Sequence, residues 1–375
     1  MTGDRSTERS GIKDELLKQF DLYDTTVDVV SCWESFVEHS YRDEMDSLKF
    51  DRFPCIPDPR IDGKKLTPDF TVCFDKKYGI IGEISRTFPK EEEYFLKEME
   101  QLLNYDGELS IKSDDGKECV PDTTDILLLI EGTAAPQIVN RIRGFVDEGK
   151  LGFNNNLIIM RYTFNQSSTF SRYEFQKEFH IGGTFRDSVL PGHCSLSKKF
   201  DEEYETLKVY PRHFAEIKSR KPICNDEPPP HYLATIFWHK FFADHICEED
   251  YKDWRWGTAS KIKSIVLEPY EFTRRVNERF NLDGDVRVKW VKDSLDFLCA
   301  AKLATYDHRE KTYEVGFRDF KVSIGEKERY QNGLMARREV KELTYKFIDR
   351  YARYSKEDIK ADGDEEKTHP TLLDF

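Results

Sequence analysis

The stretch LTPDFTVCFDKKYGIIGEIS, residues 66–85, decides the fold. Two runs within it, 69–74 and 78–84, are rich in β-branched and aromatic residues and are separated by a short polar segment, which predicts a β-hairpin. Asp69 opens the first predicted strand and Glu83 ends the second. Antiparallel pairing therefore brings both carboxylates to the same end of the sheet, where a divalent metal can bridge them.

This hairpin resembles that of the PD-(D/E)XK nuclease superfamily, in which a Pro-Asp opens one strand and a Glu-x-Lys lies on the next. Pro68-Asp69 and Glu83-Ile84 match that pattern, whereas Ser85 stands where the family usually has its lysine. The resemblance implies a metal-dependent nuclease in which Asp69 and Glu83 are catalytic and bind Mg²⁺ or Mn²⁺. The departure at Ser85 concerns catalysis and leaves the expected fold unchanged.

A helix is predicted over residues 90–105, after the hairpin. Its apolar stripe recurs at helical spacing and consists of Phe95, Met99 and Leu102. Lys97, Gln101 and Tyr105 repeat at every fourth position and share a neighbouring face. Residues 101–105 are similar to the Gln-x-x-x-Tyr element of a RecB-like branch of the superfamily, which implies that Gln101 faces the active site. Lys97, one turn earlier, is our hypothesis for a displaced catalytic lysine, as in viral cap-snatching endonucleases.

Two helices are predicted before the hairpin. The first covers residues near 12–20 and the second covers 28–45, with a turn at 21–26 between them. Asp28 is the expected N-cap of the second helix.

The second of these helices carries further candidate site residues. In the superfamily the equivalent helix often supplies another acidic metal ligand, and the resemblance implies Glu34 as the first choice and Glu38 as the second. His39 is of interest because the viral branch uses a histidine from this region. The alternative is that all three lie on a solvated helix face.

The fold class predicted for this region is α/β. Residues 125–130 and 156–162 are continuous apolar runs typical of buried central strands, and a helix is predicted between them at 136–147. Strand, helix and strand at this spacing imply a parallel crossover. An edge strand is expected at 48–56. The order αβββαβ, in a mixed sheet flanked by helices, matches the restriction-endonuclease-like core of the superfamily.

The sequence predicts four segments. A change of pattern follows residue 163, and the run DEPPP at 226–230 has the composition of a stiff linker. The segments are a nuclease-like domain at 1–163, a β-rich insertion with a bulge and the linker at 164–230, a helical domain at 231–354, and an acidic disordered tail at 355–375.

The helical domain resembles a winged-helix domain. After an apolar helix at 232–246, it shows helices at 269–280 and 286–303 and a short hairpin near 305–315. This resemblance implies DNA contact through basic side chains of the second of these helices and of the wing. The residues are Arg287, Lys289, Lys292, Lys302, Arg309 and Lys311. A solvated basic face is the alternative.

Composition describes a globular protein with a well-solvated surface. The 375 residues are 38% hydrophobic and 34% charged, with a net charge of −13. A net negative charge argues against a protein whose whole surface binds nucleic acid. A nuclease can nevertheless have a local basic surface that contacts phosphates. Residues 261–350 contain more Lys and Arg than Asp and Glu. The eight cysteines include no Cys-x-x-Cys pair suited to zinc. With no membrane-spanning run and no signal-peptide pattern, we expect a cytoplasmic protein.

Other motifs are weaker matches to a nuclease site. Pro57-Asp58 suits a turn, Pro121-Asp122 precedes a single buried strand, and Glu216-Ile217-Lys218 has no Pro-Asp hairpin before it. Glycine-rich phosphate loops and the serine-hydrolase and zinc-protease motifs are missing from the sequence. The apolar end of the tail, residues 372–375, is a candidate docking peptide for a protein partner.

The leading functional hypothesis is a metal-dependent DNA endonuclease of restriction, transposition or phage defence. One alternative is a nuclease fold that has lost activity and serves as a binding or scaffold subunit for nucleic acid or protein, which Ser85 and the acidic charge favour. A second is an RNA endonuclease like the viral enzymes, which His39 and the displaced lysine favour.

Overall fold

The computed structural model describes residues 3–86, 88–113, 115–166, 171–200, 206–209, 223–224, 226–242, 264–279, 286–316 and 333–354. The chain divides into two units, one comprising Thr26–Asn225 and the other comprising Met1–Thr25 with Asp226–Phe375. The linker predicted at 226–230 lies at this division. The first 25 residues group with the C-terminal part of the chain, and the predicted tail at 355–375 lies outside the described residues.

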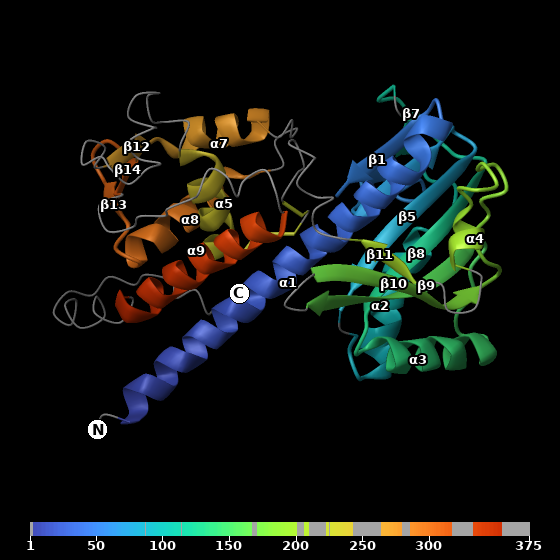
Figure 1. Ribbon diagram of the computed structural model, residues 1–375, viewed down its shortest axis with the longest axis horizontal. Coiled ribbons are helices and arrows are strands. Elements are labelled where there is room, and N and C mark those ends of the chain that lie inside the picture. The colour runs from blue at the N-terminus through green and yellow to red at the C-terminus, as the bar shows by residue number, and fades with distance from the viewer. Residues whose placement is uncertain are drawn as a thin grey trace. The chain divides into compact units, whose positions relative to one another are not determined.

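Helices and strands alternate along much of the described chain (Figure 1). The helices are α1 (Gly3–Tyr41), the 3-10 turn η1 (Arg42–Glu44), α2 (Glu92–Asn104), α3 (Ala135–Asp147), α4 (Leu196–Phe200), α5 (Pro230–Lys240), α7 (Pro269–Arg279), α8 (Val288–Ala300) and α9 (Gly333–Tyr354). The strands are β1 (Leu48–Arg52), β2 (Ile56–Pro57), β3 (Lys65–Leu66), β4 (Phe70–Phe74), β5 (Tyr78–Ser85), β6 (Ile111–Lys112), β7 (Glu118–Cys119), β8 (Thr123–Glu131), β9 (Asn156–Gln166), β10 (Ser171–Ile181), β11 (Leu207–Val209), β12 (Ser264–Leu267), β13 (Ala304–Asp307) and β14 (Thr312–Gly316). No helix within these ranges is both long enough and apolar enough to cross a bilayer.

Unit Thr26–Asn225 is a mixed α/β structure. Among its described residues a seven-stranded sheet has the order β1-β4-β5-β8-β9-β10-β11. The predicted hairpin is confirmed, because β4 and β5 pair antiparallel, and so is the parallel crossover, because β5, β8 and β9 run parallel. The sheet is mixed and curled, with helices on both faces (Figure 1).

Each face of this sheet is covered by helices with matching apolar stripes. On one face Phe95, Met99 and Leu102 of α2 and the apolar residues of α3 pack with the strands in a single buried cluster. On the other face Trp33 of α1 stacks on Phe70 of β4, with ring centroids 6.0 Å apart. Because side chains alternate along a strand, Asp69 belongs to the side opposite Phe70.

Position 82 must be glycine because the ring of Phe70, its partner across the hairpin, occupies the space that a side chain would need. A Cβ placed on Gly82 would lie 2.2 Å from two atoms of that ring. The ring cannot move aside, because Trp33 and Phe50 both stack on it. The glycine thus lets the aromatic side chain lie flat over the strand that carries Glu83.

Gly82→Ala is expected to lower the free energy of unfolding by about 1–3 kcal/mol, the usual cost of overpacking a core. Urea unfolding measures the change. The matched control is Gly144→Ala in α3, where an added Cβ meets nothing within 4 Å. There the substitution should stabilise by about 0.5–1 kcal/mol. A Gly82→Ala protein as stable as the wild type would contradict the packing described.

The turn predicted at 21–26 is wrong, since α1 continues through these residues as one helix. The Thr25 hydroxyl donates to the Asp21 carbonyl at 2.7 Å, which keeps this polar residue inside the helix. Tyr23 is buried against Tyr232, with ring centroids 4.6 Å apart. Asp28 is likewise inside the helix and is not an N-cap, and its carboxylate accepts a hydrogen bond from the Tyr173 hydroxyl at 3.0 Å.

The strands predicted in 164–230 continue the large sheet. β10 pairs with the extended β9 along most of its length, and β11 pairs with β10. The register shifts between Lys177 and Phe179, at the site of the predicted bulge.

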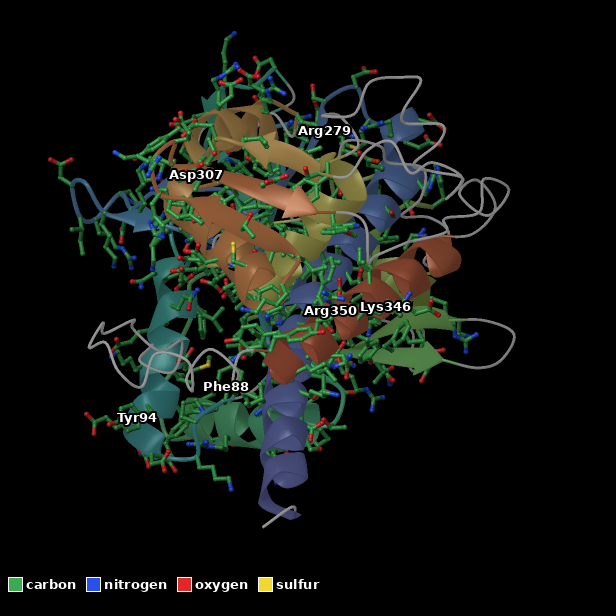
Figure 2. The ribbon with its side chains drawn as sticks, turned by 90° about the vertical axis from the view of Figure 1, so that its left-hand side faces the viewer. Phe88, Tyr94, Arg279, Asp307, Lys346 and Arg350 are labelled. Carbon is green, nitrogen blue, oxygen red and sulfur yellow. The ribbon has the colours of Figure 1, made fainter. Side chains whose placement is uncertain are left out.

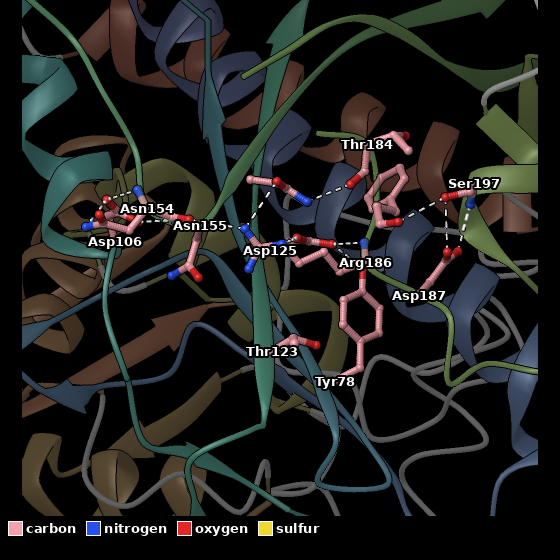
Figure 3. Close-up of polar contacts among 12 residues, drawn as sticks. Tyr78, Asp106, Thr123, Asp125, Asn154, Asn155, Thr184, Arg186, Asp187 and Ser197 are labelled. Carbon is pink, nitrogen blue, oxygen red and sulfur yellow. Dashed lines mark hydrogen bonds and ion pairs between the residues drawn. The ribbon is translucent and has the colours of Figure 1, made fainter. Parts of the chain in front are cut away.

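A buried polar network ties the amino ends of the parallel strands to residues 184–187 (Figure 3). Asp125 of β8 is 0% exposed and accepts hydrogen bonds from the Tyr78 hydroxyl at 2.8 Å and the Arg186 backbone N–H at 2.7 Å. The Arg186 Nε lies 3.9 Å from the other carboxylate oxygen. Burial raises the pKa of Asp125 to about 6, against the lowering effect of these donors.

The described part of the other unit contains α5, α7, α8 and α9 and a sheet with the order β12-β14-β13. The predicted helices at 269–280 and 286–303 correspond to α7 and α8, and the predicted hairpin corresponds to β13 and β14. The Trp238 ring of α5 packs edge-on against Phe347 of α9. Its core is thus aromatic, as the apolar helix predicted at 232–246 implies.

Candidate active site

The candidate site lies where the parallel strands β5, β8 and β9 end. Glu83 is close to the carboxyl end of β5, and Glu131 is the last residue of β8. In open α/β sheets, ligands bind outside the carboxyl ends of the strands, so this edge is the expected position for a site.

Asp69 and Glu83 meet at this edge. Asp69 immediately precedes β4, and its backbone N–H donates to the Gly82 carbonyl at 3.0 Å. Its carboxylate accepts a hydrogen bond of 2.7 Å from the Ile84 N–H, which belongs to the peptide group joining Glu83 to Ile84. Both acidic residues are half-buried. The structure therefore places Asp69 and Glu83, the two acidic residues that the hairpin pattern singled out, at the same end of the β4–β5 hairpin.

The carboxylate of Glu83 is held by the helix that follows the hairpin. The Gln101 side-chain N–H donates to Glu83 Oε1 at 2.9 Å, and the Tyr105 hydroxyl donates to Oε2 at 3.1 Å. Gln101 also donates to the Tyr105 oxygen at 3.1 Å, so the three side chains form a closed triangle. Each carboxylate oxygen has a fixed partner, and the Glu83 side chain is oriented by α2.

Tyr105 is the partner that the sequence did not assign a role. It is 1% exposed, and burial raises the pKa of its hydroxyl, as do the charges of Glu83 and Asp69. The hydroxyl is therefore protonated at neutral pH and acts as a donor. Its fourth-position spacing from Gln101 is the signal that identifies it.

Lys97 lies one helical turn before Gln101, roughly 6 Å further along the axis. It is exposed, and among the residues described it forms no hydrogen bond or ion pair. The structure thus leaves its ammonium group available to a ligand but joins it to neither carboxylate.

Glu34 has a partner of its own. It is buried on α1 and pairs with Arg52 of β1, with 3.4 Å between Arg52 Nε and Glu34 Oε2. Glu38 pairs with Arg42, and His39 is exposed. Across the described ranges there is no group of three or more His, Cys, Asp or Glu side chains placed to hold a metal ion. Glu34 therefore does not complete a three-ligand set with Asp69 and Glu83.

Arg86 is a further charged residue at this edge. Its guanidinium donates to the Thr26 hydroxyl at 2.9 Å, and its positive charge acts on the buried hydroxyl of Tyr162. Burial raises the pKa of Tyr162 to about 12, and the charge of Asp69 contributes in the same direction. The signal in the sequence that points to Arg86 is its position directly after Ser85, the last residue of β5.

The donor set suits a hard divalent cation. Mg²⁺ and Mn²⁺ prefer carboxylate oxygens and are often held by one or two carboxylates. An ionised carboxylate has about four acceptor positions. The hydrogen bonds from Ile84 to Asp69 and from Gln101 and Tyr105 to Glu83 are of the kind that orients such a ligand. Hydrogen-bonded carboxylates are also typical of metal sites, where outer partners orient the ligands.

The competing motifs lie elsewhere. Asp58 is in a turn, its carboxylate enclosed by Arg60 and Lys64. Asp122 precedes β8 and is exposed. Residues 216–218 lie outside the described part of the chain.

The predicted DNA-contacting residues are all on the described surface of the C-terminal unit. Lys289 pairs with Glu227 at 3.3 Å, and Lys292 lies over the exposed ring of Tyr270. Arg287 lies over Trp290. Asp307, which is labelled in Figure 2, precedes Arg309 and Lys311 in the chain. Its carboxylate accepts hydrogen bonds from the backbone N–H groups of Arg309 and Glu310.

Comparison with protein-family models, with curated proteins and with solved structures finds no match to the chain. Its function is therefore inferred from its own residues.

Proposed function

We propose that the chain is a divalent-metal-dependent endonuclease that cleaves phosphodiester bonds in DNA. The observation that carries this proposal is the convergence of Asp69 and Glu83, with Gln101 and Tyr105 fixing the Glu83 carboxylate. Together with the mixed sheet, it supports a restriction-endonuclease-like core of the PD-(D/E)XK type in Thr26–Asn225.

Each residue of the site has a role in this proposal. Asp69 and Glu83 hold Mg²⁺ or Mn²⁺, which when bound lowers the pKa of a water molecule and stabilises negative charge on the phosphate. Gln101 and Tyr105 keep the Glu83 carboxylate in one orientation. Lys97 neutralises charge that develops on the phosphate, and Arg86 adds a fixed positive charge at the same edge.

The C-terminal unit is proposed to be winged-helix-like and to hold the DNA. The order of α7, α8 and the β13–β14 hairpin supports this. Arg287, Lys289, Lys292, Arg309 and Lys311 are the proposed phosphate contacts. Restriction, transposition and phage defence are the settings in which such a two-part enzyme is expected.

A cleavage assay tests the proposal. The purified chain is incubated with Mg²⁺ or Mn²⁺ and with duplex, single-stranded or branched DNA, or with RNA of the same sequence. We expect DNA cleavage that requires the metal and stops when EDTA is added. Preferential cleavage of RNA would replace the DNA proposal with the viral-like alternative. Failure to cleave any substrate with either metal would contradict an active nuclease.

Lys97→Ala is expected to reduce that cleavage by about 100-fold, because the positive charge that would neutralise the reacting phosphate is lost. Lys97→Arg should retain part of the activity, since it keeps the charge. The matched control is Lys90→Ala, which removes an exposed lysine just before α2. Undiminished cleavage by Lys97→Ala would rule out the displaced lysine.

A nuclease fold without activity, kept as a scaffold for nucleic acid or protein, is the second candidate. It is favoured by Ser85 in the lysine position and by the Glu83 oxygens, both of which already accept hydrogen bonds from the protein. Isothermal titration with Mn²⁺ separates the two. An active site predicts binding that Asp69→Asn weakens, and a scaffold predicts no binding that depends on Asp69.

A further inference from the structure

Two cysteines of the large unit lie against each other. The Sγ atoms of Cys73 in β4 and Cys119 in β7 are 3.5 Å apart, although the residues are 46 positions apart in sequence. Both are free thiols. A disulfide requires the sulfurs to come to about 2 Å, roughly 1.5 Å closer than they lie in this structure.

The short hairpin β6–β7 is held in place beside Cys73 by its own packing. Cys119 pairs with Ile111 across this hairpin, and Cys73 pairs with Gly79 across the β4–β5 hairpin. A Cβ on Gly79 would lie 3.2 Å from Ile111 Cδ1 and 2.8 Å from Pro121 Cγ. Ile111, the cross-strand partner of Cys119, and Pro121, two residues after Cys119, therefore pack closely against Gly79, the cross-strand partner of Cys73. The approach of the two sulfurs follows from this packing.

The two thiols differ in accessibility. Cys73 is 1% exposed, and burial together with the contact to Cys119 raises the pKa of its thiol, which is therefore protonated at neutral pH. Cys119 is half-buried in a hairpin at the surface of the unit. A small oxidant in solution therefore reaches Cys119 first.

We propose that Cys73 and Cys119 form an oxidation site at which a peroxide converts the two thiols into a disulfide. In the first step the Cys119 sulfur attacks hydrogen peroxide, giving a sulfenic acid and one water molecule. In the second the Cys73 sulfur attacks the Cys119 sulfur, its thiol proton leaves with the hydroxyl group as a second water molecule, and the S–S bond forms. The peroxide takes up two electrons, one from each sulfur. This site is independent of phosphodiester cleavage.

The bond would fix the β6–β7 hairpin to β4. Because it closes a long loop, it restricts the unfolded chain, and the oxidised protein should unfold at a higher urea concentration than the reduced protein. Dithiothreitol should reverse the shift.

Peptide mass spectrometry tests the proposal on the full chain. Reduced protein is treated with hydrogen peroxide, remaining thiols are alkylated, and the digest is searched for linked peptides. We expect the Cys73 and Cys119 peptides to be joined with the loss of two hydrogens, and Cys55→Ser, which removes an exposed thiol, to leave the link unchanged. In Cys73→Ser, Cys119 should accumulate as a sulfenic acid that dimedone traps.

Three outcomes would overturn it: conversion of Cys119 to sulfinic acid in the wild type without a link to Cys73, a link from Cys119 to Cys55 instead, or equal urea midpoints for the oxidised and reduced wild-type protein. The comparison of urea midpoints uses only the wild-type protein, so it remains a valid test even if a serine substitution impairs folding.

Discussion

Glu83→Gln is expected to lower metal-dependent DNA cleavage by about 10²–10³-fold, a loss typical of removing one electrostatic group from an active site. The substitution removes the negative charge but keeps the shape of the side chain. Its amide oxygen can still accept from Gln101, and its amide N–H can donate to the Tyr105 oxygen. The loss should therefore arise without unfolding, which urea denaturation of the variant checks.

The matched control is Glu131→Gln. Glu131 ends the neighbouring strand β8 and accepts a hydrogen bond from Thr133, so it is a carboxylate of the same edge outside the proposed ligand pair. This variant should cleave like the wild type. If both variants lost activity equally, the general charge of the edge would be responsible. If Glu83→Gln retained full activity, the proposed site would be wrong.

The stability of the protein should depend on Asp125 between pH 4 and pH 7. The pKa of this carboxyl is about 6 when folded and 3.8 unperturbed. Because the pKa of Asp125 is higher in the folded protein than in the unfolded chain, protonation of Asp125 stabilises the fold. This stabilisation is complete below pH 3.8 and is lost as the pH rises through 6. A shift of about two units corresponds to about 3 kcal/mol. The stability of Asp125→Asn relative to the wild type should therefore increase as pH rises.

Urea unfolding of both proteins at a series of pH values measures this difference. Tyr78→Phe provides a second test, because the Tyr78 hydroxyl donates to Asp125 and lowers the pKa of that carboxyl. Without that donor the transition should move to higher pH. A difference between wild type and Asp125→Asn that stays constant from pH 4 to pH 7 would contradict the buried, ionisable Asp125.

Local pattern was sufficient to predict the strands and the acidic pair. The residues of the β4–β5 hairpin and of β8 strongly favour strands, and antiparallel pairing of the hairpin placed Asp69 and Glu83 at the same end of the sheet. The resemblance of residues 101–105 to a Gln-x-x-x-Tyr element implied that Gln101 faces the site, and Gln101 donates a hydrogen bond to Glu83. These contacts join residues that are close in sequence or lie on paired strands, so sequence patterns can predict them.

Relations that depend on distant partners were not predicted. The break expected in α1 is overridden by the packing of Tyr23 on Tyr232, far along the chain. The partner of Glu34 is Arg52, a cation on an edge strand that no spacing rule connects to that helix. The polar cluster around Asp125 likewise depends on Arg186, which approaches through an irregular segment.

The grouping of the first 25 residues with Asp226–Phe375 has a consequence for biosynthesis. Phe20 and Tyr23 leave the ribosome long before Tyr232, against which both pack. At about 5–20 residues per second, translation of the intervening segment delays that contact by on the order of tens of seconds. During this interval the aromatic side chains of the amino-terminal segment have no native surface to cover them. Nascent chains of this protein should therefore be substrates for a chaperone that binds exposed aromatic side chains, until the carboxyl-terminal part emerges.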